Sequence, residues 1–321
     1  MKRALGLGLG LLLLATSCGS DFDPKSSVKT VRVLAIRSEL PYARPGETVK
    51  LEALVHDARI SPPEPMRFYW FPLPCIDPPL GQYYGCYPAF EALFPPRVDL
   101  TPYLPQGTTV SIPIPADALA NHQPRPGLTG EPTATGYVFF MACAGHVERV
   151  PRPTNLDPNA LPVGCFSSGG QRLGQEDFIF GFTRVFVFPE RRNAIPVPSG
   201  LTKGGEPIDP KVPLVIPPCM KDPCETVELD MRVDDAAAEI DPENFGPDGN
   251  QGRETLYVDW FTTIGKMGAD RKILWDPFLG RPPKTVVTYE PPREPGTGKL
   301  WGVLHDNRGG VTWIEVNVEI K

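Results

Sequence analysis

Two stretches far apart in the chain alternate apolar and polar residues in the same way. The first is GETVKLEALVHDA (residues 46–58) and the second is CETVELDMRVDDA (residues 224–236), with Glu, Thr, Val, Leu, Val, Asp and Ala recurring in register. The alternating apolar positions are Val49, Leu51, Ala53 and Val55 in the first, and Val227, Leu229, Met231 and Val233 in the second. A period of two residues is typical of a strand with one buried face. The pattern predicts a strand after a turn in each stretch.

The similarity continues in the same order along both halves of the chain. Residues 68–71 (FYWF) correspond to 258–261 (VDWF), residues 109–110 to 285–286, and residues 136–139 loosely to 299–303. Each half ends on an alternating strand, residues 181–189 and 311–320. Solenoid repeats run roughly 20 to 50 residues. A repeat offset of 178 residues therefore indicates tandem domains.

Each half contains several short strands with turn signals and no convincing helical period, which predicts a β-sandwich. Trp70 and Trp260 lie in the middle of corresponding strands. Packing between two sheets is the favoured role for both rings, and ligand binding through aromatic contacts is the alternative. Asn307-Arg308-Gly309-Gly310 suits a tight turn between the last two strands, because Asn and Gly tolerate positive φ.

Three features together resemble the immunoglobulin-like and PKD-type modules of bacterial surface lipoproteins. They are the PGETVKLEALVHD strand, the two mid-strand tryptophans and the HDNRGGVTWIEVNVEI hairpin (residues 305–320). Phe-Thr-Thr follows Trp260 where a PKD repeat has Phe-Gly-Asp, and the residue 46–58 strand lacks the cysteine of an immunoglobulin core disulfide. The resemblance therefore implies a generic immunoglobulin-like fold: an all-β chain with two tandem sandwich domains after a lipoprotein signal peptide.

The N-terminal segment is typical of a signal peptide. Lys2 and Arg3 precede an apolar run (residues 4–14) and then small residues. The run is much shorter than the roughly 20 residues of a membrane-spanning helix. Ala15-Thr16-Ser17-Cys18 resembles a lipobox, although Ala15 stands where Leu is usual. The resemblance implies lipidation of Cys18, and Gly19 favours sorting to the outer membrane; cleavage by ordinary signal peptidase is the alternative.

Domain boundaries follow from the repeat and the N-terminal segment. We expect a signal peptide at 1–17, a lipidated tether at 18–27, a first immunoglobulin-like domain at 28–190, a linker at 191–211 and a second domain at 212–321. The predicted location is the cell envelope.

Cysteine content supports export. The chain has seven cysteines, so six remain once Cys18 is assigned to the lipid. Six cysteines allow 15 pairings. We favour the three nearest-neighbour disulfides, which are Cys75–Cys86, Cys143–Cys165 and Cys219–Cys224, because short closures form most easily.

Charge argues against nucleic acid as a partner. Without Lys2 and Arg3 the chain carries 30 basic and 38 acidic side chains. An acidic surface gains nothing from a phosphate backbone. The 41 Pro and 31 Gly residues indicate a folded protein rich in loops.

Two Pro-rich insertions in the first half, residues 71–107 and 144–177, are far longer than ordinary connections. Residues 76–96 of the first insertion contain a cluster of five aromatic residues: Tyr83, Tyr84, Tyr87, Phe90 and Phe94. These rings form either a binding surface for a partner, as in antibody paratopes, or a layer that packs onto the sandwich and holds the loop rigid. Burial against the sandwich is the favoured interpretation.

The acidic stretch DPENFGPDGNQGRE (residues 241–254) is a weak calcium candidate through Asp241, Glu243 and Asp248. Its spacing differs from that of an EF-hand, and a solvated turn explains the same composition. We expect no cofactor and no dedicated metal site.

Sequence motifs for catalysis are missing. The four histidines (His56, His122, His146 and His305) form no close pair, and no nucleophile elbow or phosphate-binding loop is complete. We therefore expect no enzyme, but a lipid-anchored structural or protein-binding module whose partners are the membrane and another envelope protein or glycan. A calcium-dependent adhesin or glycan-binding surface protein is the alternative.

Overall fold

The computed structural model describes residues 23–60, 64–120, 131–151, 160–247 and 249–321. The predictions for the signal peptide, Cys18, His122 and Asp248 lie outside these residues. Strands dominate the described chain, in which α1 (Tyr87–Leu93) is a single short α-helix. None of the helices in this part has the length and apolar character that crossing a bilayer requires.

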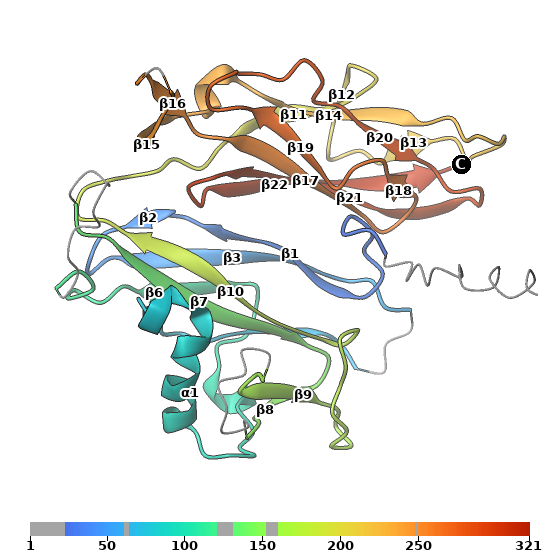
Figure 1. The fold of residues 1–321 in the computed structure, drawn as a ribbon. Coiled ribbons are helices and arrows are strands. Elements are labelled where there is room, and N and C mark those ends of the chain that lie inside the picture. The colour runs from blue at the N-terminus through green and yellow to red at the C-terminus, as the bar shows by residue number, and fades with distance from the viewer. Residues whose placement is uncertain (1–22, 61–63, 121–130, 152–159, 248) are drawn as a thin grey trace, which may run out of the picture.

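The first domain is a sandwich of two sheets (Figure 1). One sheet has the order β1-β3-β6, with strands Val31–Ser38, Thr48–Asp57 and Thr109–Pro113. The other has the order β2-β10-β7-β4, with strands Tyr42–Ala43, Phe178–Val187, Ala134–Cys143 and Arg67–Trp70. β5 (Cys75–Ile76) also pairs with β7 in this sheet. Additional short elements lie outside the sandwich: β8 (His146–Arg149), β9 (Val163–Phe166) and 3₁₀ turns at Pro79–Gly81, Tyr83–Cys86 and Thr101–Tyr103.

The second domain repeats this plan with two five-stranded sheets. One has the order β12-β11-β14-β20-β18, with strands Glu206–Ile208, Pro198–Lys203, Val227–Val233, Val287–Glu290 and Lys266–Met267. The other has the order β13-β22-β21-β17-β19, with strands Leu214–Ile216, Val311–Ile320, Gly296–Asp306, Leu256–Thr262 and Arg271–Trp275. A separate hairpin of β15 (Ile240–Phe245) and β16 (Gln251–Arg253), and a 3₁₀ turn at Asp235–Ala237, complete the domain.

The two domains share one strand topology, which confirms the predicted repeat. β3 and β14 carry the repeated segment, and each pairs antiparallel with the first strand of its domain (β1 or β11) and with a later strand (β6 or β20). In each domain a short strand then runs parallel to the last strand, β2 along β10 and β13 along β22. A first strand divided between the two sheets in this way is an immunoglobulin-like arrangement. The prediction of two tandem immunoglobulin-like sandwiches is confirmed.

Both mid-strand tryptophans fill the interior of their sandwich. Trp70 and Trp260 are fully buried, each in the hydrophobic core of its own domain. The Trp70 indole nitrogen donates a hydrogen bond to the carbonyl of Gly107 at 2.9 Å. The packing interpretation is confirmed, and the ligand-binding alternative is wrong because neither ring reaches the surface.

All three predicted disulfides are present, at Cys75–Cys86, Cys143–Cys165 and Cys219–Cys224. The first two hold the insertions of the first domain. The third closes the connection between β13 and β14.

The segment predicted as a linker is partly a strand pair of the second domain. β11 and β12 lie within residues 191–211, and β11 pairs with β14 so that Leu201 lies opposite Met231. Leu201 is buried in the core of the second domain, which explains why this segment is ordered into the sheet. Residues 188–197, which contain no strand, make the connection between the sandwiches.

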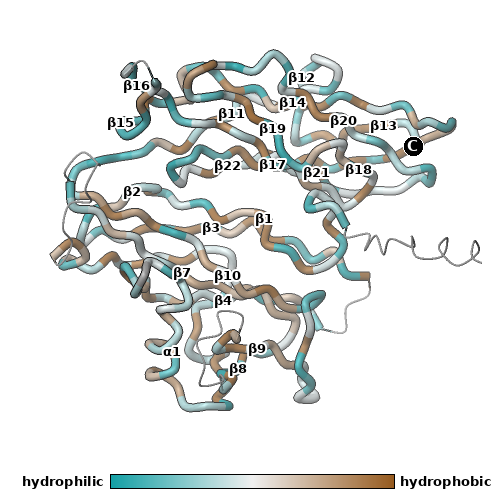
Figure 2. Tube along the Cα trace, in the orientation of Figure 1, coloured by the Kyte–Doolittle hydropathy of each residue, from teal (hydrophilic) through white to brown (hydrophobic). Residues whose placement is uncertain are grey.

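The two sandwiches pack face to face, so that four sheets are stacked (Figure 1). The outer face of β1 and β3 lies on the outer face of β17, β21 and β22. Buried apolar residues from both domains form this interface: Val28, Leu34, Ala35, Leu54, Phe261, Trp301, Val303 and Val311. Figure 2 shows hydrophobic stretches along β1 and β3, which are apolar on both faces.

Aromatic rings and their polar partners extend this interface. The His56 ring lies 4.9 Å from the Trp301 ring, and the Arg37 guanidinium lies 4.5 Å from the centre of the Trp313 ring. The Trp301 indole donates a hydrogen bond to Glu315 at 2.7 Å. The buried donor is therefore satisfied, and the side chain is fixed in the interface.

The N-terminal segment, residues 23–28, crosses to the second domain before the chain enters β1. Ser27 forms a parallel bridge with Thr262, and the amide of Val28 donates to the carbonyl of Thr262 at 2.9 Å. The Lys25 ammonium binds the Asp259 carboxylate at 3.1 Å. The predicted tether is thus bonded to the second domain from Lys25 onward.

We expect Trp301→Ala to lower the free energy of unfolding by about 3–5 kcal/mol, because it removes a fully buried indole from the domain interface. Urea unfolding followed by circular dichroism measures this change. Ile273→Ala, on the same sheet but at a 46% exposed position, is the control and should cost less than about 1 kcal/mol. Equal losses in the two variants would show that the interface is not stabilising.

Candidate functional site

The aromatic insertion does not form an open contact surface. Tyr87 and Phe90 are buried, and the Tyr83 ring stacks on Phe182 at 4.7 Å. Tyr84 and Phe94 are half-buried. The insertion, including α1, covers the outer face of β7 and β10, where Phe139, Phe180 and Phe182 would otherwise be exposed. The favoured packing interpretation agrees with this burial, and the contact-surface alternative is wrong for Tyr87 and Phe90.

The described acidic side chains of residues 241–254 form hydrogen bonds and ion pairs with neighbouring residues. Asp241 accepts a hydrogen bond from the amide of Glu243 at 3.0 Å and one from the Asn307 side chain at 3.5 Å. Glu243 forms an ion pair with Arg191. Within the described ranges, no three His, Cys, Asp or Glu side chains lie where they could hold a metal ion together.

The described histidines lie on different strands. His56 packs on Trp301, and His146 shares a hydrogen bond with Glu148 at 2.8 Å. His305 stacks on Tyr257 at 4.8 Å, with its Nε2 atom 3.7 Å from the Asp259 carboxylate. Burial lowers the pKa of His305 to about 4, so the ring is neutral near pH 7 and is part of the interior.

A cluster of exposed apolar residues lies at one end of the second domain. The cluster consists of Ile240 (60% exposed) and Phe245 (59%) from the β15–β16 hairpin, and Phe278 (51%) and Leu279 (88%) from the turn after β19. We call these four residues the apolar tip. Exposed apolar side chains that lie close together are candidates for a contact surface.

The turn that carries Phe278 and Leu279 is held in place by Asp276. The Asp276 carboxylate accepts hydrogen bonds from the amides of Phe278 at 3.0 Å and Leu279 at 2.9 Å. Asp276 and Gly280 also exchange backbone hydrogen bonds, and Gly280 has a φ of +75°, which favours glycine. The two apolar side chains are therefore presented by a fixed backbone.

The turn packs directly on the β15–β16 hairpin. The amide of Arg253 donates to the carbonyl of Pro277 at 3.2 Å. The Phe278 ring lies so close over Gly252 that an added Cβ would be 2.7 Å from it. Gly252 thus allows the ring to rest on β16, which joins the two parts of the tip.

Two arginine side chains pack near Trp275, at the base of the turn that carries Phe278 and Leu279. The guanidinium groups of Arg253 and Arg281 lie 5.6 and 6.0 Å from the centre of the Trp275 ring. Arg281 also binds Asp235 at 2.7 Å, and Arg253 donates to the carbonyls of Asp235 and Ala238 at 2.8 Å. Aromatic and arginine side chains are the residue types enriched in protein interfaces.

The apolar tip was not predicted from the sequence. Its signal is WDPFLGR, residues 275–281, in which Asp-Pro and Gly mark a turn while its centre holds Phe and Leu. Apolar residues at the centre of a turn have no core to enter, which distinguishes them from strand residues of the same type.

Behind the tip, a network of buried charges fixes the last hairpin turn to the first domain. Arg308 binds Glu254 at 2.7 Å and Glu239 at 2.8 Å, and its guanidinium lies 6.0 Å from the centre of the Tyr42 ring. Asp306 accepts hydrogen bonds from Asn193 and from two backbone amides of the turn. The structural role predicted for the turn at residues 307–310 agrees with these contacts.

A cleft of about 230 Å³ lies between the domains beside this network. Its lining includes Tyr42 and Phe186 from the first domain, and Asp241 and Asn307 from the second. Tyr42 and Phe188 pack at 4.4 Å, so the aromatic wall is itself part of the joint between the domains. The cleft is smaller than a typical ligand site, and the arrangement around it is that of a rigid joint.

Comparisons with known proteins leave the family open. No protein-family model matches the chain, and no curated protein matches it. The structure of murine CEACAM1b aligns with 88% of this chain and 100% of its own, at 11% identity and a TM-score of 0.20. Dimeric latent PorU from Porphyromonas gingivalis aligns with 91% of this chain and 24% of its own, at 10% identity and a TM-score of 0.21. Three N-terminal domains of the bacteriophage RB49 outer capsid protein Hoc align with 91% of this chain and 99% of their own, at 9% identity and a TM-score of 0.21. Superpositions at these TM-scores carry no argument about function, and the fold assignment rests on the strand order and pairing described above.

Glu254→Gln should change how stability depends on pH. Burial, with Asp306 nearby, raises the pKa of Glu254 to about 7. Between about pH 4.5 and 7 the folded chain keeps a proton that the unfolded chain has lost, so this group makes the free energy of unfolding fall as pH rises. The fall is as much as about 3 kcal/mol, and it should be absent in the variant.

Urea unfolding of wild type and variant from pH 4 to 8 measures the difference. Burial of His305 produces the opposite slope below pH 6.5, because its pKa is lowered. The difference between the two proteins cancels that contribution. Glu228→Gln, at an exposed position of β14, is the matched control. Parallel curves for wild type and Glu254→Gln would contradict the raised pKa.

Proposed function

We propose that the chain is a lipid-anchored protein of the outer membrane that binds another envelope protein through the apolar tip. The observation that carries the proposal is the exposure of Ile240, Phe245, Phe278 and Leu279 on a backbone fixed by hydrogen bonds. A preformed surface loses little conformational freedom on binding. The tip therefore suits recognition of a folded partner.

The position of the N-terminal segment supports an anchored orientation. This segment bonds to Thr262 at the end of β17, whereas the β15–β16 hairpin immediately precedes Leu256 at the start of β17. The strand between them is seven residues long, roughly 20 Å at 3.3 Å per residue. An anchor at Cys18 leaves the tip on the side of the domain away from the membrane.

Packing of the two sandwiches makes the module stiff. The interface around Trp301 and the network around Arg308 join the domains at two places. The two domains therefore form one rigid body that carries the apolar tip. The partner we expect presents an apolar surface, with acidic groups at the rim opposite Arg281.

Replacing Cys18 by Ser should move the protein from the membrane fraction to the soluble fraction, because a thioether-linked lipid can no longer form. Fractionation of cells that express the full chain measures the release, and intact mass of the wild-type protein measures the lipid. A membrane-bound Cys18→Ser protein, or a wild-type mass that matches the bare polypeptide, would refute the anchor.

Leu279→Asp should reduce crosslinking of the partner at least about tenfold, which corresponds to roughly 1.4 kcal/mol. The measurement is quantitative crosslinking in native envelopes, with the bound species compared between variants. Val197→Asp places the same charge at a 70% exposed apolar position outside the tip and serves as the control. Equal crosslinking in both variants would show that the partner binds elsewhere.

A further inference from the structure

Several loops of the second domain lie at the same end as the N-terminal segment. The amide of Thr263 donates to the carbonyl of Lys299 at 3.0 Å, and the Tyr289 hydroxyl donates to the carbonyl of Ile264 at 2.9 Å. The amide of Cys219 donates to the carbonyl of Pro292 at 2.9 Å. These bonds gather the turn after β17, the turn before β21 and the disulfide loop between β13 and β14. Figure 1 shows β13, β18 and the C-terminus together at this end.

The disulfide loop presents apolar groups to solvent. Met220 is 80% exposed, and Val212 and Val215 on the approach to the loop are also exposed. Residues 217–220 continue into the loop as Pro-Pro-Cys-Met, and Cys219–Cys224 closes it over a separation of five residues. A loop closed so tightly keeps Met220 at the surface, because few other conformations are available to it.

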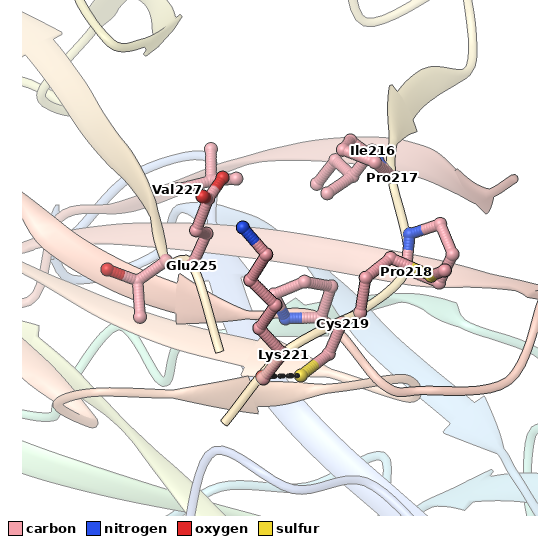
Figure 3. Close-up of a pocket in the computed structure, with 10 residues that line it drawn as sticks. Ile216, Pro217, Pro218, Cys219, Lys221, Glu225 and Val227 are labelled. Carbon is pink, nitrogen blue, oxygen red and sulfur yellow. Dashed lines mark hydrogen bonds between the residues drawn. The ribbon is translucent and has the colours of Figure 1, made fainter. Parts of the chain in front are cut away.

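A cavity of about 210 Å³ lies behind this loop (Figure 3). Ile216, Pro217 and Pro218 form one wall, and Val227 with the stems of Lys221 and Glu225 lies across from them. The wall is apolar, and the Lys221 ammonium and the Glu225 carboxylate stand at its edge. This is the chemistry of a headgroup boundary, where an apolar body faces acyl chains and a lysine reaches the phosphates.

The chain outside the described residues limits the distance from an anchor. Cys18 precedes Lys25, the first residue bonded to the second domain, by seven residues, which span at most about 25 Å when fully extended. The segment from Lys25 to Val28 is fixed on the second domain. A lipid on Cys18 therefore holds this end of the domain within about 25 Å of the bilayer surface.

We propose that the disulfide loop of residues 217–226 rests on the bilayer, with Met220 at the level of the headgroups and Lys221 beside the phosphates. This inference rests on the lipidation of Cys18 that forms part of the proposed function. The loop supplies a second, weak contact, and two contacts fix the orientation of the molecule where one lipid alone allows it to swing. The apolar tip is then held away from the membrane surface.

A nitroxide label tests the contact in the lipidated full chain, reconstituted in vesicles of phosphatidylethanolamine and phosphatidylglycerol. The label is attached through Met220→Cys in one protein and through Leu279→Cys, at the 88% exposed tip, in the control. We expect the label at position 220 to lose access to a water-soluble nickel relaxant and to gain access to oxygen, which concentrates in the acyl region. The label at position 279 should keep full access to nickel.

Each outcome has one meaning. Equal nickel access at both positions in a protein whose intact mass includes the lipid overturns the membrane contact and leaves the anchor standing. Shielding at position 220 without gain of oxygen access also overturns it, because a second protein copy then covers the loop. An intact mass without the lipid refutes the anchor itself. The same labels in the Cys18→Ser protein, mixed with vesicles, measure how strongly the loop binds the bilayer without the anchor. Loss of nickel access at position 279 in any sample would refute the proposed orientation.

Discussion

Burial of the β1–β3 sheet between two other sheets is the constraint on which the architecture depends. One face of these strands closes the first sandwich through Val49 and Leu51, and the other meets the second domain at Trp301. A strand buried on both faces can neither slide nor tilt without losing apolar contacts on one side. The relative position of the domains is therefore fixed by the same strands that complete the first core.

Much of the fold was predictable because its signals are local. Alternation at residues 46–58 and 224–236 identifies two equivalent strands, and the order of later similarities reproduces the common topology. Nearest-neighbour cysteine pairing was correct for a similar reason, since each bridge closes a loop within a single connection. The tryptophans were assigned to the core from their mid-strand position, and both are buried there.

The contacts between elements were less predictable. Leu34 and Leu54 are ordinary apolar residues in sequence, and only the second domain makes them interior. The fate of the aromatic insertion depended on Phe180 and Phe182, about 90 residues further along the chain, which need a cover. β11 and β12 are short and lie among Pro and Gly, so the pattern suggested a linker. The apolar tip was not predicted because Phe278 and Leu279 lie in a turn, where no alternating pattern marks apolar residues as exposed.

The bonding of residues 25–28 to the second domain has a mechanical consequence. The chain enters the molecule along Thr262 and only then continues into β1 of the first domain. The bridge between Ser27 and Thr262 is parallel, so tension along the N-terminal segment loads its hydrogen bonds in shear, together with the Lys25–Asp259 ion pair. A force applied at the N-terminus therefore acts first on the second domain. The β1-β3-β6 sheet carries that force only after the bonds of the N-terminal segment break.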